Sequence, residues 1–158
     1  VGGDTLFANQ FLAYETLSSG MKELLDGLIC IHSAKPIYGK DSLSSRSFHN
    51  MPIEQNETAN AEMEHPVVRT HPESGRKGLF VNTNFSIRFK GITAEESAPI
   101  LNFLFEHASR EAFTCRFRWQ KGSVAFWDNR AAMHLALNDY NGYRREMHRV
   151  TVAGDSPY

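Results

Sequence analysis

The fold of this chain is indicated most directly by a stretch in which apolar and polar residues alternate strictly, FTCRFRWQ (113–120). Successive side chains of a β-strand point to opposite faces of a sheet, so this alternation predicts a strand with one buried face. The apolar residues that share this face are Phe113, Cys115, Phe117 and Trp119. We expect Cys115, like Cys30 in an apolar stretch upstream, to lie in the core.

Further short strands, separated by turns that contain glycine, are predicted on both sides of this stretch. Their ranges are 29–32, 66–70, 78–82, 124–128 and 145–152. Apolar residues recur at helical spacing over 9–28, with a break at 18–20, and a capping box from Thr93 to Glu96 opens a helix that reaches Ala108. Many short strands and few helices favour a mainly β fold with flanking helices, of the β-sandwich or jelly-roll kind.

The composition limits the classes of protein to which the chain can belong. Its 158 residues, of which 41% are hydrophobic and 22% charged, fit one domain with its own core. The formal net charge of -1 argues against a nucleic-acid partner or a polybasic membrane binder. The sequence has no apolar run that could span a membrane and no signal-peptide pattern. Two cysteines cannot form a disulfide framework, so we expect a cytoplasmic protein.

Residues 35–64 differ from the rest of the chain, because they are rich in Ser, Asn, Glu and Gly and show no regular period. A long stretch without structure of its own is either disordered or functional. We expect a lid or mobile loop here that excludes water from a site.

The segment 127–149 holds the residues best suited to chemistry. Arg145 and Arg149 fall on one face of a predicted strand, with Cα atoms about 13 Å apart. The planar fork of arginine binds carboxylates and sulfonates, so the pair suits an anion clamp; a solvated face of a sheet is the alternative. His134 lies eleven residues before Arg145, and a single histidine is by itself weak support for a metal site.

A search for a complete metal site finds one partial pattern. A ferrous oxygenase site needs two histidines and one carboxylate, and two of these ligands usually follow the pattern His-x-Asp or His-x-Glu. The single match, His71-Pro72-Glu73, falls in a predicted turn that ends at Gly75, and we interpret it as a coincidence. No nucleophile motif, phosphate loop or Cys-x-x-Cys pair is present, so a hydrolase has no support either.

Seven stretches spread over nearly the whole chain resemble one family of enzymes. They are GGDTLFAN (2–9), HPVVRTHP (65–72), FVN (80–82), WDNR (127–130), MH (133–134), NDY (138–140) and RREMHRVT (144–151). The same stretches occur in the same order in the taurine dioxygenase-like family, which also contains alkylsulfate and aryloxyalkanoate dioxygenases. The chain resembles the C-terminal part of these enzymes.

This resemblance implies a double-stranded β-helix, or jelly roll, and the use of Fe(II), 2-oxoglutarate and O2. By motif position, His134 matches the distal iron-binding histidine of the family. Arg145 matches the arginine that pairs with the far carboxylate of 2-oxoglutarate, and Thr5 matches the threonine whose hydroxyl helps to hold it.

The resemblance also implies a reaction, which is hydroxylation of a small anionic organic substrate with release of succinate and CO2. A sulfonate, an alkyl sulfate and an aryloxyalkanoate all fit a pocket that contains an arginine. Arg149 matches a residue that faces the substrate anion or the cosubstrate, and Tyr38 and Phe85 align with aromatic residues of the substrate pocket. Apart from this substrate we expect no nucleic acid and no membrane as partners, and a homodimer or homotetramer as the assembly.

One departure from the family bears on all of these expectations. In relatives a His-x-Asp pair precedes the Gly-Gly-Asp-Thr stretch, at positions that would lie before Val1. We therefore expect residues 1–158 to be the C-terminal part of a single dioxygenase domain, with a fold that is incomplete at the N-terminus. A metal-free jelly-roll module, for binding or structure, and an inactive fragment are the alternative interpretations.

Overall fold

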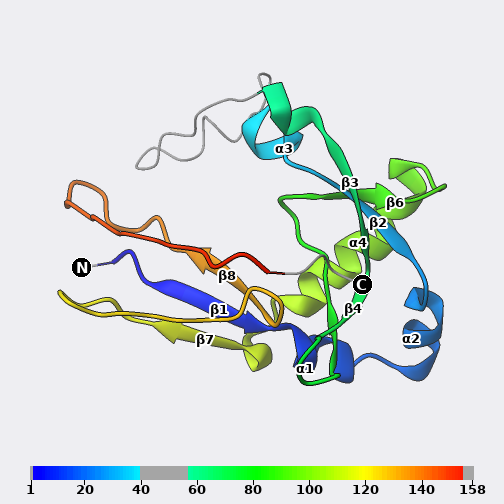
Figure 1. Ribbon diagram of the computed structural model, residues 1–158, viewed down its shortest axis with the longest axis horizontal. Helices are drawn as coiled ribbons and strands as arrows, with labels where there is room; N and C mark the ends of the chain where they lie inside the picture. Colours follow the sequence, from blue (N-terminus) through cyan, green and yellow to red (C-terminus); the bar gives the residue numbers. More distant parts are fainter. Residues whose placement is uncertain (1, 40–56, 155–158) are drawn as a thin grey trace.

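The computed structural model of the chain describes residues 2–39 and 57–154 (Figure 1). These residues form two three-stranded antiparallel sheets and a separate two-stranded hairpin, with helices packed around them. The strands of the first sheet come from opposite ends of the chain, which brings the first described residues next to those beyond residue 114.

The first sheet has the strand order β7-β1-β8. Its central strand β1 (Thr5–Asn9) pairs with β7 (Thr114–Phe117) on one side and with β8 (Ala132–Ala136) on the other. Figure 1 shows β1, in blue, between these two strands. The pairing joins segments that are far apart in sequence, so this sheet depends on tertiary contacts rather than on local propensity.

The second sheet has the order β3-β2-β6, with β2 (Ile29–Ser33) between β3 (Glu62–Pro66) and β6 (Ser86–Phe89). The hairpin consists of β4 (Val68–Thr70) and β5 (Lys77–Leu79).

Helices occupy the connections between these strands. They are α1 (Gln10–Glu15), α2 (Ser19–Leu25), α3 (Lys35–Tyr38) and α4 (Ala94–Ala108), with short 3-10 turns η2 (Glu57–Asn60) and η3 (Glu111–Phe113). The predicted capping box is present at the start of α4, where the Thr93 hydroxyl accepts from the Glu96 amide and the Glu96 carboxylate accepts from the Thr93 amide.

The core is formed where α4 packs against β6 and α1 (Figure 1). The predicted apolar stripe of α4 faces this core, and Leu101 and Leu104 are buried. The other large side chains of this core are those of Leu25, Val67, Leu79, Val81 and Phe89. Burial of a side chain of this size stabilises the fold by about 1.5–3 kcal/mol.

The strand predictions are confirmed in part. The range 29–32 lies within β2, the range 113–120 contains the shorter strand β7, and 66–70 and 78–82 overlap the hairpin. Strands β1, β6 and β8 were missed, and so was β3 apart from Pro66. The strands predicted at 124–128 and 145–152 are wrong, because neither range forms a backbone ladder with any described residue. Val150 is 95% exposed and Phe126 is 94% exposed, so apolar composition did not ensure pairing here.

Of the two cysteines predicted to lie in the core, one is buried and one is exposed. Cys30 is fully buried on β2, as expected. Cys115 is exposed, so the expectation that it lies in the core is wrong. It lies on β7, an edge strand of the first sheet. Alternation shows which side chains share a face, but it does not show whether another element covers that face.

Part of the lid predicted at 35–64 lies outside the described residues, namely 40–56. The described ends of this range carry structure, because they form α3, η2 and the beginning of β3. Among the described residues, no helix combines the length and the apolar character that crossing a membrane requires.

A buried histidine on β2 makes the stability of this fold sensitive to pH. The His32 ring stacks on Phe80, meets the His65 ring edge-on, and shares a hydrogen bond of 3.0 Å with the Ser86 hydroxyl. Burial, followed by the nearby His65, lowers the pKa of His32 to about 4. The neutral ring is therefore the form that the folded protein favours.

We expect acid to destabilise the protein through His32. Its folded pKa lies below its ordinary value, so its contribution is complete above about pH 6.5 and is lost as the pH falls towards 4. The loss between pH 7.5 and pH 5 should be on the order of 2 kcal/mol in the free energy of unfolding. Denaturant unfolding at a series of pH values measures it. A His32→Gln variant should show a smaller acid loss, and an equal loss in both proteins would contradict this assignment.

Candidate active site

One face of the first sheet carries two of the six predicted site residues, Thr5 and His134. In the register of this sheet, Thr5 is paired with Phe117, and Phe7 is paired with both Cys115 and His134. Directly paired residues of antiparallel strands lie on the same face, as do residues two apart along a strand. Thr5 and His134 therefore project from the same side of the sheet.

The surroundings of His134 suit a metal ligand. Its exposed ring lies 5.0 Å from the Trp127 ring and 6.3 Å from the Phe7 ring, measured between centroids. Partial burial, and then the positive charge of Arg149, lower the pKa of His134. Both effects favour neutral imidazole, which is the form that binds metals.

The described residues supply only part of a metal centre. Among them, no group of three or more His, Cys, Asp and Glu side chains could hold an ion. The His71-Pro72-Glu73 pattern lies in the turn between β4 and β5, as the sequence predicts, and the Nδ1 atom of His71 accepts from the Glu73 and Ser74 amides. The role of His134 as an iron ligand stays a prediction, which would need further ligands from outside the described residues.

Thr5 lies in a setting that leaves its hydroxyl proton available. The residue is 4% exposed, and its oxygen accepts a hydrogen bond of 2.9 Å from the Trp119 indole. An oxygen that accepts from the indole can still donate its own hydrogen to an anion. Trp119 was not predicted as a site residue, although the alternation of 113–120 placed it on the face shared with Phe117.

Arg145 is held in a way that leaves the end of its fork open. Its Nε atom donates to the Gly3 carbonyl at 3.1 Å, and its guanidinium lies 5.5 Å from the centre of the Tyr140 ring. Within the described residues, its two terminal nitrogens make no hydrogen bond or ion pair. They can therefore bind a carboxylate in bidentate fashion.

The loop before β1 brings Gly3, two residues before Thr5, against the Arg145 side chain. Gly2 and Gly3 have φ values of +94° and +74°, which favour glycine. A Cβ atom on Gly3 would lie 2.7 Å from the Arg145 Cδ and Nε atoms, so only glycine permits this approach. The Gly3 amide also donates to the Asp139 carboxylate at 2.6 Å.

Arg116 contacts both Asp4, which follows Gly3, and Asp139, which accepts from the Gly3 amide. Its Nε atom donates to the buried Asp4 carboxylate at 2.7 Å, and its Nη2 atom lies 3.7 Å from Asp139. Sequence reasoning missed both roles. It quoted the Gly-Gly-Asp and Asn-Asp-Tyr stretches only as matches to a family, because no local pattern shows that they touch.

The remaining predicted residues divide into two groups. Arg149 lies close enough to His134 to act on its pKa. Tyr38 lies at the end of α3 and Phe85 precedes β6, where its carbonyl accepts from the Ser33 amide at 2.8 Å. No hydrogen bond, ion pair or ring contact within the described ranges joins Tyr38 or Phe85 to His134. Their role in a substrate pocket stays a prediction.

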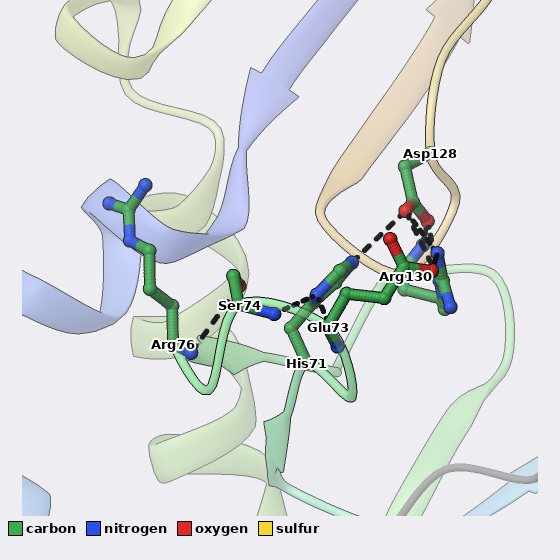
Figure 2. Close-up of polar contacts among 6 residues, drawn as sticks. All are labelled: His71, Glu73, Ser74, Arg76, Asp128 and Arg130. Atoms are coloured by element: carbon green, nitrogen blue, oxygen red, sulfur yellow. Dashed lines mark hydrogen bonds and ion pairs between the residues drawn. The ribbon is translucent and has the colours of Figure 1, made fainter.

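A second polar cluster lies at the start of β8 (Figure 2). The Asp128 carboxylate is bound by His71 at 3.0 Å and by the Arg130 guanidinium at 2.8–3.1 Å. Arg130 also pairs with Glu73. The Arg130 guanidinium holds the pKa of Asp128 well below its usual range, so this carboxylate stays ionised.

The comparisons with known proteins assign a family. The protein-family model described as "Taurine catabolism dioxygenase TauD, TfdA family" matches residues 1–151 of this chain. The chain therefore belongs to this family of dioxygenases, which confirms the resemblance seen in the sequence.

Individual relatives agree with this assignment. The chain is 39% identical over 158 residues to the alpha-ketoglutarate-dependent sulfate ester dioxygenase of Pseudomonas putida, covering 99% of this chain and 52% of that protein. It is 33% identical over 158 residues to the alpha-ketoglutarate-dependent 2,4-dichlorophenoxyacetate dioxygenase of Cupriavidus pinatubonensis, covering 98% and 52%. The chain spans about half the length of these relatives.

The structure also resembles a solved taurine dioxygenase from Burkholderia xenovorans, with a TM-score of 0.72 and 40% sequence identity. The match covers 90% of this chain and 43% of that one. This confirms the predicted fold class, a mainly β jelly roll with flanking helices.

We expect a Gly3→Ala variant to be destabilised and to lose the contact between Arg145 and the Gly3 carbonyl. The positive φ costs about 1–2 kcal/mol for an L-residue, and the collision with Arg145 adds to this. Gly91→Ala is the matched control, because Gly91 has a φ of +77° but no atom within 4 Å of its Cβ position. Denaturant unfolding should show a larger loss for Gly3→Ala, and equal losses would contradict the close approach.

Proposed function

We propose that the protein to which this chain belongs is an Fe(II)- and 2-oxoglutarate-dependent dioxygenase that hydroxylates a small anionic organic substrate. The observation that carries this proposal is the position of the Arg145 guanidinium. Its Nε atom donates to the carbonyl of Gly3, two residues before Thr5, and its two terminal nitrogens are left open to an anion. Thr5 projects from the sheet face that carries His134, and Arg145 contacts the backbone two residues before Thr5.

In the proposed reaction each of these residues has a distinct role. When bound, Fe(II) supplies the oxidising chemistry by which O2 converts 2-oxoglutarate to succinate and CO2 as the substrate is hydroxylated. His134 provides one neutral nitrogen ligand. Arg145 pairs with the far carboxylate of 2-oxoglutarate, and the Thr5 hydroxyl donates to the same group. The Phe7 and Trp127 rings restrict water on one side of His134.

For the substrate we propose a sulfonate, an alkyl sulfate or an aryloxyalkanoate, all of which present an anion to Arg149. The names of the relatives support this range, since they include sulfate ester, 2,4-dichlorophenoxyacetate and taurine dioxygenases. We also propose that the protein works in the cytoplasm, where a thiol as exposed as that of Cys115 stays reduced.

An Arg145→Ala variant should bind 2-oxoglutarate more weakly by about 10- to 150-fold. A charge-assisted pair contributes about 1.5–3 kcal/mol, and 1.4 kcal/mol corresponds to a tenfold change. Calorimetric titration of the metal-loaded, oxygen-free protein measures this. Arg144→Ala is the matched control, because Arg144 is the neighbouring arginine and its exposed guanidinium pairs with Glu146. An unchanged affinity in Arg145→Ala would contradict the proposal.

An Arg149→Ala variant should lose affinity for anionic substrates and retain it for uncharged analogues of the same shape. The reason is that the guanidinium acts on the charge of the substrate and makes little contact with its carbon skeleton. The ratio of kcat/KM values for a matched charged and uncharged pair measures the effect. If both substrates lose equally, Arg149 does not face the substrate anion.

A further inference from the structure

The turn that precedes β8 is closed on a single residue, Asp128. Its carbonyl accepts from the Ala131 amide at 3.1 Å and from the Ala132 amide at 3.0 Å. Its carboxylate accepts from the Arg130 amide at 2.7 Å. The main chain from Asp128 to the first residue of β8 is therefore determined by hydrogen bonds to one residue.

Two side chains from different parts of the chain hold Asp128 in place. The Nδ1 atom of His71 accepts from the Glu73 and Ser74 amides, so the single proton of the neutral ring lies on Nε2 and points at Asp128 (Figure 2). Arg130 closes over the same carboxylate from the other side. The turn between β4 and β5 is thus attached to the turn before β8.

The residues that follow this turn are hydrogen-bonded to β1 and to the start of α1. The Ala131 carbonyl accepts from the Gln10 amide at 2.9 Å, and Ala132 is paired with Asn9. Two residues later, His134 is paired with Phe7. Side chains alternate between faces with a period of two, so a slip of one residue would move His134 to the face of Leu6 and away from Thr5.

We infer that Asp128, held by His71 and Arg130, is a positioning residue that sets the register of β8 on β1 and thereby the face on which His134 lies. This inference rests on the proposed function for the role of His134, while the effect on register does not depend on it. Asp128 acts through the backbone of β8 and does not itself bind the metal or the substrate.

The metal affinity of the full-length protein tests the first consequence. Mn(II) is a suitable probe, because it accepts the same nitrogen and oxygen ligands as Fe(II) and is stable in air. Asp128→Ala should weaken Mn(II) binding by about 10- to 100-fold, the usual cost of losing a group that orients a ligand. His71→Gln should give a smaller loss of Mn(II) affinity. It is the variant to use if Asp128→Ala does not fold.

The matched control is Glu73→Ala. Glu73 belongs to the same cluster, but within the described residues its exposed carboxylate pairs with the Arg130 guanidinium and makes no hydrogen bond to Asp128 or to the main chain of 128–132. Its removal should leave Mn(II) affinity within about twofold, because an exposed ion pair contributes little.

A crosslink reads the register without any metal. Leu6 and Leu135 are paired across β1 and β8, so Leu6→Cys with Leu135→Cys in a Cys115→Ser background should form a disulfide under mild oxidation. Asp128→Ala should reduce its yield several-fold, and Glu73→Ala should leave it unchanged.

Weaker Mn(II) binding together with a lower crosslink yield supports the inference. An unchanged crosslink yield in Asp128→Ala overturns it, as does unchanged Mn(II) affinity when the crosslink is lost. If the unaltered full-length protein binds no Mn(II), the proposed function fails, and the crosslink yields still decide whether Asp128 sets the register.

Discussion

The structure depends on the backbone ladders that β1 makes with β7 and β8. These ladders join residues 5–9 to residues 114–117 and 132–136, so they close loops of more than a hundred residues. Because the pleat alternates, one choice of register decides which side chains share a face. In this register Thr5 and His134 share a face, and the His134 ring lies beside the rings of Phe7 and Trp127. The site is therefore a property of the sheet and of no single segment.

The second constraint is close approach at the beginning of β1. The amide and carbonyl of Gly3 are both used, one by Asp139 and the other by Arg145. Such an arrangement needs a residue without Cβ at position 3. Arg116 helps to hold the nearby carboxylates of Asp4 and Asp139 in place. The Arg145 side chain is thus held by a main-chain carbonyl, which is more rigid than a second side chain would be.

Much of the local structure could be predicted from the sequence, because it depends on short-range rules. The capping box of α4, the apolar stripe of that helix and the turn that ends at Gly75 each follow from residues a few positions apart. Short-range rules failed for two segments: strand β8 was missed, and the strand predicted at 145–152 does not form. A strand is stable only when another strand offers its hydrogen-bonding edge, and the identity of that partner is not a local property.

The sequence by itself determined the family and the mainly β class, and its motif order named His134, Thr5 and Arg145 as candidate site residues. The tertiary structure decided which of them meet. It placed Thr5 and His134 on one sheet face. It also put Arg145 against the Gly3 carbonyl and the Trp119 indole against the Thr5 hydroxyl, and it left Cys115 exposed. The reason is that motifs record the chemistry of residues along the chain, whereas distances between residues a hundred positions apart are set by strand pairing and packing.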